Sequence, residues 1–136
     1  MDAIATQKFL RASPQKLREV VAMIKDMKPT QAIEILPFVG KRGAEPILKV
    51  IKSAMANASL KGMATADIVF KEIQIGEGPS LKRGIAVSRG RYHPILKKMA
   101  HIRVVVGTVE AKKEEVKIET KKAVKAKGKE SRGTKN

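Results

Sequence analysis

The sequence contains no cysteine, no tryptophan, one tyrosine and three phenylalanines among its 136 residues. Without cysteine, the chain forms neither a disulfide framework nor a zinc finger or knuckle. With so few aromatic side chains, it lacks the platforms on which single-strand-binding proteins stack bases. No apolar run approaches the roughly 20 residues that span a bilayer. Residues 1–8 also lack the basic and apolar regions of a signal peptide, so we expect a cytoplasmic protein or one inside an organelle.

Acidic residues are scarce as well. The 13 Asp and Glu residues stand against 29 Lys and Arg, which gives a formal net charge of +16. So much charge of one sign opposes compaction unless an anionic partner neutralises it. Nucleic acid or an anionic membrane surface is therefore the expected partner, and an enzyme with an anionic pocket is disfavoured. The length suits one domain plus an appendage, with a small aliphatic core.

No catalytic or metal-binding pattern is complete. Ser13 and Lys16 match the S-x-x-K spacing of penicillin-binding enzymes, but the S-D-N and K-T-G partners are missing. His93 and His101 have no carboxylates or thiols around them at metal-ligand spacing. A P-loop, a full dinucleotide fingerprint, an RNP motif and a GXXG loop are also missing. We therefore expect no enzyme, no metal and no cofactor, and recognition of the shape and phosphate backbone of a folded RNA.

The first 60 residues show helical periodicity. Ser13 before Pro14 predicts an N-cap followed by proline at the first helical position. Thr30 is expected to cap a shorter helix that Pro37 stops. With the spacing of the apolar residues, these signals predict a strand over residues 4–11 and three helices. The first runs from residue 14 to between 25 and 28, the second over 30–36, and the third from about 43 or 45 to 58.

After residue 67 the pattern changes to the alternation typical of strands, at residues 68–75 and 102–106. Between them lie about 25 residues with several glycines and prolines, and a structureless loop of that length is unusual in a small domain. We expect the two strands to continue outward as a hairpin over about residues 76–102, with its tip near Arg89 and Gly90. A lone two-stranded ribbon is marginally stable in water, so it requires a partner.

These elements predict an α+β fold, with three helices packed on a small antiparallel sheet and a long protruding β-hairpin. Residues 1–110 are expected to form one domain, because composition changes after Glu110. Residues 111–136 contain ten Lys or Arg and four Glu, with few large apolar side chains. Such a segment buries too little apolar surface to fold, so we expect a disordered basic tail.

The distribution of charge is the most informative feature. The 32 residues from Gly78 to Val109 contain no acidic residue. A solvated surface normally mixes both signs, so this segment is expected to face a polyanion. Its seven cations are Lys82, Arg83, Arg89, Arg91, Lys97, Lys98 and Arg103.

The start of the first helix offers a second cationic region. Arg11, Lys16 and Arg18 surround the backbone N–H groups at that end, which attract anions. From this segment alone, an anion-binding site and an ordinary capped helix with solvated cations are equally supported.

Three linked motifs give the sequence a recognisable pattern. Arg-Ala-Ser-Pro-Gln-Lys opens residues 11–36, Lys-Ser-Ala-Met-Ala-Asn-Ala lies within residues 47–58, and residues 77–106 run from Gly-Pro-Ser-Leu-Lys-Arg to His-Ile-Arg-Val-Val-Val. In order and spacing, over residues 5–108, the chain resembles the bacterial type of the large-subunit ribosomal protein twenty-two family.

The resemblance implies a structural constituent of the cytoplasmic large ribosomal subunit. Such a protein binds large-subunit rRNA, supports subunit assembly and lines the nascent-peptide exit tunnel with its hairpin tip. It implies rRNA, neighbouring ribosomal proteins and the nascent peptide as partners, with no membrane and no homo-oligomer. By position it predicts rRNA contacts at Lys8, Arg11, Ser13, Lys16, Arg18, Lys82, Arg83, Lys97, Lys98, His101 and Arg103. It places the tunnel tip at Val87, Ser88, Arg89, Gly90 and Arg91.

The chain departs from the family pattern at two places. Ala86, Val87 and Ser88 stand where the family carries a proline and a further cation, so the family's tip stiffness and nascent-chain contact do not carry over directly to this sequence. Met99 and Ala100 replace a Thr-Ser pair, which removes two hydroxyls available to RNA.

Two other functions are compatible with the composition. One is a non-ribosomal, basic RNA-binding architectural protein. The other is a basic membrane-surface or chaperone-like module anchored by the tail. The tail has too few apolar residues for a strong amphipathic helix, which disfavours the membrane module.

Overall fold

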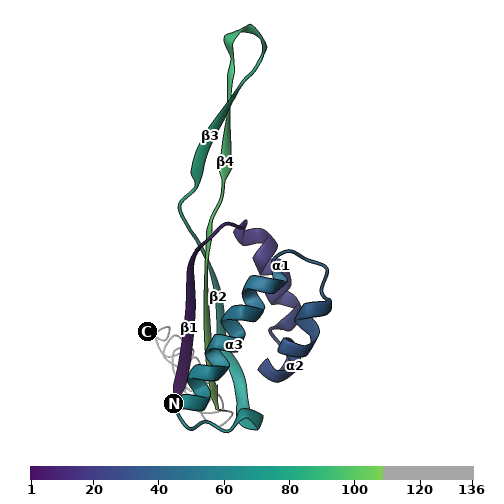
Figure 1. Ribbon diagram of the computed structural model, residues 1–136, viewed down its shortest axis with the longest axis vertical. Helices are drawn as coiled ribbons and strands as arrows, with labels where there is room; N and C mark the ends of the chain where they lie inside the picture. Colours follow the sequence, from purple (N-terminus) through teal and green to yellow (C-terminus); the bar gives the residue numbers. More distant parts are fainter. Residues whose placement is uncertain (109–136) are drawn as a thin grey trace, which may run out of the picture.

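The structure, a computed structural model, describes residues 1–108 (Figure 1). A three-stranded antiparallel sheet carries helices on one face, and a two-stranded ribbon extends from one end of it. The elements are β1 (Asp2–Leu10), α1 (Pro14–Ile24), α2 (Pro29–Ile35), α3 (Ala44–Leu60), β2 (Ile68–Glu77), β3 (Leu81–Ala86), β4 (Tyr92–Lys97) and β5 (Ala100–Thr108). Three short 3₁₀ turns join them, namely η1 (Leu36–Phe38), η2 (Thr65–Asp67) and η3 (Ser88–Gly90). The expected α+β fold is confirmed.

The sheet has the strand order β1-β5-β2, so β5 is central and pairs with both edge strands. Val106 of β5 lies opposite Ala3 of β1 on one side and opposite Phe70 of β2 on the other. All three side chains are buried. Because side chains alternate across a strand, this row and the parallel rows along β5 form the floor of the core.

The helices cover that floor with the apolar residues that the periodicity predicts. Leu17, Val20 and Ile24 of α1 are buried, as are Ile47 and Ile51 of α3. The longest helix, α3, packs against β1 and β5, while α1 contacts β2 (Figure 1). Burial of each such aliphatic side chain contributes about 1.5–3 kcal/mol. This core holds the elements that position the cationic residues.

Two predicted helix caps differ from the structure. Ser13 is the N-cap of α1, but its hydroxyl makes no capping hydrogen bond. The second helix begins at Pro29, with Lys28 as N-cap, so Thr30 lies inside it. Both helices start at a proline, whose fixed φ suits the first helical position and whose missing N–H needs no partner. The start of each helix is therefore marked by proline, and neither helix has a capping hydrogen bond from a side-chain hydroxyl.

The predicted hairpin is present, but its strands do not simply continue those of the sheet. Residues 78–80 and residues 98–99 interrupt them, and β3 and β4 form a separate sheet. Across this joint the Gly78 N–H donates a hydrogen bond of 2.9 Å to the Met99 carbonyl. Every residue of β3 and β4 is exposed. The expected hairpin is thus a ribbon, hereafter residues 81–97, attached to the helix-covered sheet through an irregular joint.

The tip of the ribbon lies where the sequence predicts it. Arg89 and Gly90 both have positive φ, at 63° and 68°. The Val87 N–H donates to the Arg91 carbonyl at 2.8 Å, which closes the loop. The expected tail over residues 111–136, with the domain boundary at 110, lies outside the described residues. Among residues 1–108, no helix is long and apolar enough to cross a membrane.

Candidate nucleic-acid interface

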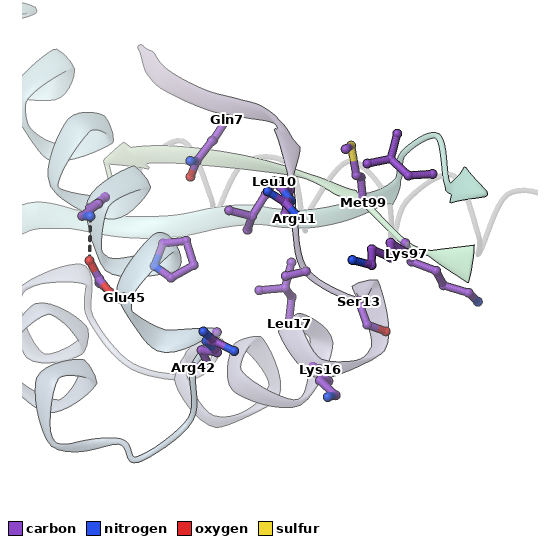
Figure 2. A pocket seen from close by; sticks show the side chains of 16 residues that line it. Gln7, Leu10, Arg11, Ser13, Lys16, Leu17, Arg42, Glu45, Lys97 and Met99 are labelled. Atoms are coloured by element: carbon purple, nitrogen blue, oxygen red, sulfur yellow. Dashed lines mark hydrogen bonds and ion pairs between the residues drawn. The ribbon is translucent and has the colours of Figure 1, made fainter. Parts of the chain in front are cut away.

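A cleft of about 600 Å³ lies at the base of the ribbon (Figure 2). Its walls come from four separate parts of the chain: the end of β1, the first turn of α1, the start of α3 and the base of the ribbon. Five of the predicted rRNA-contact residues meet there, namely Arg11, Ser13, Lys16, Lys97 and Lys98. The tertiary fold therefore joins the helix-start cations and the ribbon cations into one concave surface.

Two further cations line the same cleft and were not predicted as contacts. Arg42 comes from the turn before α3, and Lys49 comes from the second turn of that helix. The Lys-Arg pair within the sequence Gly-Lys-Arg-Gly was interpreted only as a turn. A basic turn beside a helix start is a weak signal, because only the packing of α3 against α1 brings Arg42 to Lys16.

The single carboxylate in the cleft lining is paired. Lys49 Nζ donates a hydrogen bond of 2.6 Å to Glu45 Oε1, one helical turn away (Figure 2). This hydrogen bond, followed by the charge of the ammonium group, lowers the pKa of Glu45 from its ordinary value. The carboxylate therefore stays ionised, and its charge is balanced within the helix by Lys49.

Arg18 is the predicted helix-start residue that lies apart from the cleft lining. Its Nη2 donates to the Ile75 carbonyl at 3.4 Å and lies 3.9 Å from Glu77 Oε1. Both side chains are more than half exposed, so this pair is worth about 0–1 kcal/mol. Arg18 therefore links α1 to the end of β2, just before the joint of the ribbon.

Three predicted contacts lie on the face of the sheet opposite the helices. Arg103 alternates with the buried Ile102 and Val104, so its side chain points away from the core. It lines a shallow hollow of about 400 Å³ together with Lys8 and His101. This hollow is separate from the cleft, so the predicted contacts form more than one surface.

The imidazole of His101 already has partners within the protein. The Phe9 N–H donates a hydrogen bond of 2.9 Å to His101 Nδ1. The two rings meet edge to face with centroids 4.9 Å apart. Phe9 has a positive φ of 57° in the irregular end of β1, which aims its N–H at the imidazole. Only the Nε2 side of His101 is left for an external ligand.

The ribbon carries cations on both faces. In the β3–β4 register Arg83 lies opposite Ile95, and Lys82 lies opposite Leu96. Neighbouring residues of a strand point to opposite faces, so the Lys82 and Arg83 side chains leave the ribbon in opposite directions. At the tip, Arg89 and Arg91 are both exposed.

One departure from the family pattern has a different meaning in the structure. Ala100 is completely buried, so a hydroxyl at that position would face the core and not RNA. Met99 is half-buried and lines the cleft, so only this change alters the candidate interface.

Within residues 1–108, no group of three or more His, Cys, Asp or Glu side chains is placed to hold a metal ion.

Comparisons of the sequence with known proteins find one family. The family model described as "Ribosomal protein L22p/L17e" matches residues 5–107. The "Large ribosomal subunit protein uL22" of Desulfatibacillum aliphaticivorans is 43% identical over 107 residues, which cover 78% of this chain and 98% of that protein. The protein of the same name from Syntrophus aciditrophicus (strain SB) is 45% identical over 107 residues, covering 78% and 97%. That from Endomicrobium trichonymphae is 42% identical over 106 residues, covering 78% and 91%.

Proposed function

Because the chain belongs to the ribosomal protein L22p/L17e family and so has a structural role in the ribosome, we propose that it binds the rRNA of the large subunit through its ribbon and the cleft at the ribbon's base. The same proposal assigns the tip of the ribbon to the wall of the nascent-peptide exit tunnel. It places the protein in the cytoplasm within the large subunit, with neighbouring ribosomal proteins as its other partners.

The observation that carries this proposal is a ribbon whose strand residues are all exposed, with cations on both faces and no acidic residue. Lys82 and Arg83 leave opposite faces, and residues 78–108 contain neither Asp nor Glu. A ribbon inserted between two phosphate-rich RNA segments needs positive charge on each side. An ordinary solvated hairpin has no such requirement and normally mixes charges of both signs.

Energetics favour the same function. The ribbon exposes Ile85, Tyr92 and Leu96 by about half or more of their surface, so it gains little from apolar burial. Two strands alone are marginally stable in water. Contact with RNA neutralises the cations, releases counterions and shields both faces of the ribbon. The protein in turn lets phosphate-rich RNA segments approach one another, which is a contribution to subunit assembly.

The shape of the ribbon tip fits the proposed position in the wall of the exit tunnel better than it fits a binding pocket. Arg89 and Gly90 turn the chain with positive φ. The loop between β3 and β4 is the part of the ribbon farthest from the helices (Figure 1), and Arg89 and Arg91 are exposed in this loop. The resemblance to the family assigns this place, residues 87–91, to the tunnel surface. Arginines there would meet the nascent peptide after the rest of the ribbon is enclosed by rRNA.

Sedimentation of cell lysate through a sucrose gradient tests the proposal. The protein should migrate with large subunits and stay with them in moderate salt. Replacement of Lys82 and Arg83 by Gln should reduce incorporation, because two phosphate contacts are lost. A Lys25→Gln, Lys28→Gln variant is the matched control, since both of these lysines are exposed outside the proposed interface.

The alternative, an RNA-binding architectural protein outside the ribosome, gives a different profile. The protein would then sediment with other RNA or in a free pool, and large subunits would lack it. Flotation with membranes would contradict both functions.

A further inference from the structure

We propose that His101 is a positioning residue for the ribbon. As a neutral imidazole it holds the end of β1 beside the joint at residues 78–80 and 98–99, and its protonation in mild acid releases both. This role belongs to the protein by itself, in the absence of RNA. It therefore goes beyond the proposed rRNA binding and does not depend on it.

The hydrogen bond from β1 fixes the protonation state of the imidazole. The Phe9 N–H donates to His101 Nδ1 at 2.9 Å. A ring nitrogen that accepts a hydrogen bond carries no proton, so the one ring proton of the neutral imidazole is on Nε2. A further proton, taken up from water, would bind at Nδ1 and face the Phe9 N–H. Two donors cannot satisfy each other at this distance, so protonation breaks the contact.

The backbone of Phe9 depends on this acceptor. Its φ of 57° lies in the left-handed region, which residues other than glycine rarely adopt. The register of β1 on β5 shifts between Gln7 and Leu10, so Phe9 has no paired residue on β5. The imidazole takes the place of that pair, because it accepts the N–H and meets the Phe9 ring edge to face. Backbone in such a conformation persists only where surrounding contacts hold it.

The other side of the imidazole lies beside the joint of the ribbon. A Cβ at Gly78 would stand 3.2 Å from His101 Nε2 and 3.3 Å from His101 Cε1. It would also stand 3.2 Å from the carbonyl carbon of Met99. The missing side chain at Gly78 therefore lets the backbone of the joint approach the ring. One imidazole thus bridges the end of β1 and the first residue after β2.

The charged neighbours of the imidazole are cations. Lys8 of β1 and Arg103 of β5 line the shallow hollow of about 400 Å³ with His101, and the remaining lining residues are uncharged. The strand β5 contains no acidic residue, and the one acid of β1 is Asp2, which pairs with Lys71. Protonation would add a third positive charge to the hollow, where like charges repel one another.

The two carboxylates of β2 are engaged elsewhere. Gln74 Nε2 donates a hydrogen bond to Glu72 Oε1 on the exposed face of the strand. Glu77 Oε1 lies 3.9 Å from Nη2 of Arg18, which belongs to α1. Within residues 1–108, His101 forms no ion pair. A protonated His101 therefore gains no carboxylate partner in exchange for the lost Phe9 N–H.

The joint depends on a single backbone hydrogen bond next to this side chain. In the described chain, the bond from the Gly78 N–H to the Met99 carbonyl is the one that joins the two interruptions of the strands. His101 borders both partners, since Met99 is two residues away in the chain and Gly78 lies beside the ring. When protonation displaces the ring, this bond is expected to open more often. The ribbon then gains freedom of orientation.

NMR titration of the full chain without RNA tests this role. His93 and His101 are the two histidines, and the exposed His93 of β4 is an internal reference. In the neutral state, the ring nitrogen shifts of His101 should show a proton on Nε2 and none on Nδ1. From about pH 8 to about pH 5, the range in which imidazole ordinarily gains a proton, the Phe9 amide resonance should follow the His101 ring signals with the same midpoint.

Amide exchange shows whether the joint follows the imidazole. The protection factors of Phe9 and Gly78 should fall about two- to tenfold over the same pH range, which is the change that one ordinary hydrogen bond produces in an equilibrium. The protection factor of Val104, buried in the central strand, should stay constant. This reference distinguishes local release from unfolding of the sheet.

Two substitutions separate the acceptor from the ring. His101→Asn keeps a side-chain oxygen that accepts a hydrogen bond but does not titrate, so the Phe9 protection factor should no longer depend on pH. His101→Phe keeps a ring without an acceptor, so Phe9 protection should be low at both ends of the range. His93→Asn is the matched control and should leave the pH dependence of Phe9 as it is in the wild-type protein.

Three results would overturn the role of His101. The first is a Phe9 amide resonance that does not follow the His101 ring. The second is a pH dependence of Phe9 protection that persists in His101→Asn, since another group would then be responsible. The third is a Gly78 protection factor that is constant with pH, because the imidazole would then have no influence on the joint. Each result leaves the proposed rRNA binding untouched, which the sedimentation experiment tests separately.

Discussion

The ring of Tyr92 lies across the backbone of Gly84 in the ribbon. A Cβ built at position 84 would stand 1.7 Å from Tyr92 Cζ, so the space that a side chain would occupy is filled by the phenol. Tyr92 pairs with Ala86, and Gly84 pairs with Pro94, which puts ring and glycine on one face of the ribbon. An aromatic side chain that covers a strand glycine compensates for the missing side chain. In a ribbon without a core, this contact adds to the cohesion that the β3–β4 backbone pairing supplies.

A Tyr92→Leu variant tests that contact. In the wild-type protein, the aromatic ring current should shift the Gly84 α-proton resonances upfield, and the substitution should abolish the shift. Loss of the cross-strand contact should cost about 0.5–1 kcal/mol and accelerate amide exchange in residues 81–97 about two- to fivefold. NMR on the full chain measures both. A Tyr92→Phe variant should retain both properties, and unchanged shifts in Tyr92→Leu would contradict the contact.

A second cross-strand contact joins the two edges of the three-stranded sheet. Lys71 Nζ of β2 lies 3.1 Å from Asp2 Oδ1 of β1, and the Lys71 side chain is only 9% exposed. The side chains cross β5 at Gly107, where a Cβ would lie 2.7 Å from Lys71 Cε. Asp2→Ala should lower the free energy of unfolding by about 1–3 kcal/mol, because a nearly buried ammonium group loses this carboxylate. Urea denaturation measures the change.

The matched control for this contact is Asp26→Ala. Asp26 is exposed, so its removal should change stability by no more than about 0.5 kcal/mol. If the two variants were equally stable, the Lys71–Asp2 pair would contribute nothing to holding the sheet edges together.

The third prediction concerns the pH dependence of Glu45. Its pKa is lowered by the hydrogen bond from Lys49 and then by the charge of that ammonium group. A carboxyl whose pKa is lower in the folded than in the unfolded protein stabilises the fold above its unfolded pKa. This contribution disappears as pH falls through the folded pKa. Lys49→Met should therefore return the Glu45 pKa toward its ordinary value, as measured by NMR titration of the side-chain carboxyl carbon. Lys52→Met removes another exposed ammonium group from the same face of α3, but Lys52 is not among the groups that lower this pKa, so the titration should stay unchanged.

The fourth prediction distinguishes the function of the tip of the ribbon from that of its two strands, β3 and β4. Arg89→Ala with Arg91→Ala should alter nascent-chain passage through the ribosome more than subunit incorporation, because the tip is proposed to line the exit tunnel. Lys82→Ala with Arg83→Ala should do the reverse, because those cations lie on the strands that are proposed to face rRNA. Quantitative subunit profiles and rates of translation by the purified ribosomes compare the two double variants, each of which removes two charges. Equal incorporation defects in the two double variants would contradict this division of function between the tip and the strands.

Much of the fold could be predicted from local pattern. The 3.6-residue period predicted that Leu17, Val20 and Ile24 lie on one face of α1, and all three are buried. The segment of about 25 residues with glycines and prolines between two strand patterns indicated a protruding hairpin with its tip near Arg89 and Gly90. These predictions hold because periodicity and backbone restriction act between residues that are close in the sequence.

Other features required the three-dimensional arrangement. Thr30 was expected to cap α2, but Pro29 starts that helix. Position 100 was expected to affect RNA contact, but its side chain lies in the core. Arg42 gave only a weak signal, a basic turn beside a helix start, because its neighbours in the cleft come from segments far away in the chain.

The sequence by itself determined the elements, the charge imbalance and the family, since each is written in composition, short-range spacing or motif order. Only the tertiary structure decided that cations from β1, α1, the turn before α3 and the ribbon base would share one cleft. It also decided that the His101 imidazole would accept the Phe9 N–H and that Tyr92 would cover Gly84. The physical reason is that close packing of all the apolar faces together fixes how the helices and strands sit relative to one another. The positions of the polar side chains on their surfaces follow from that arrangement.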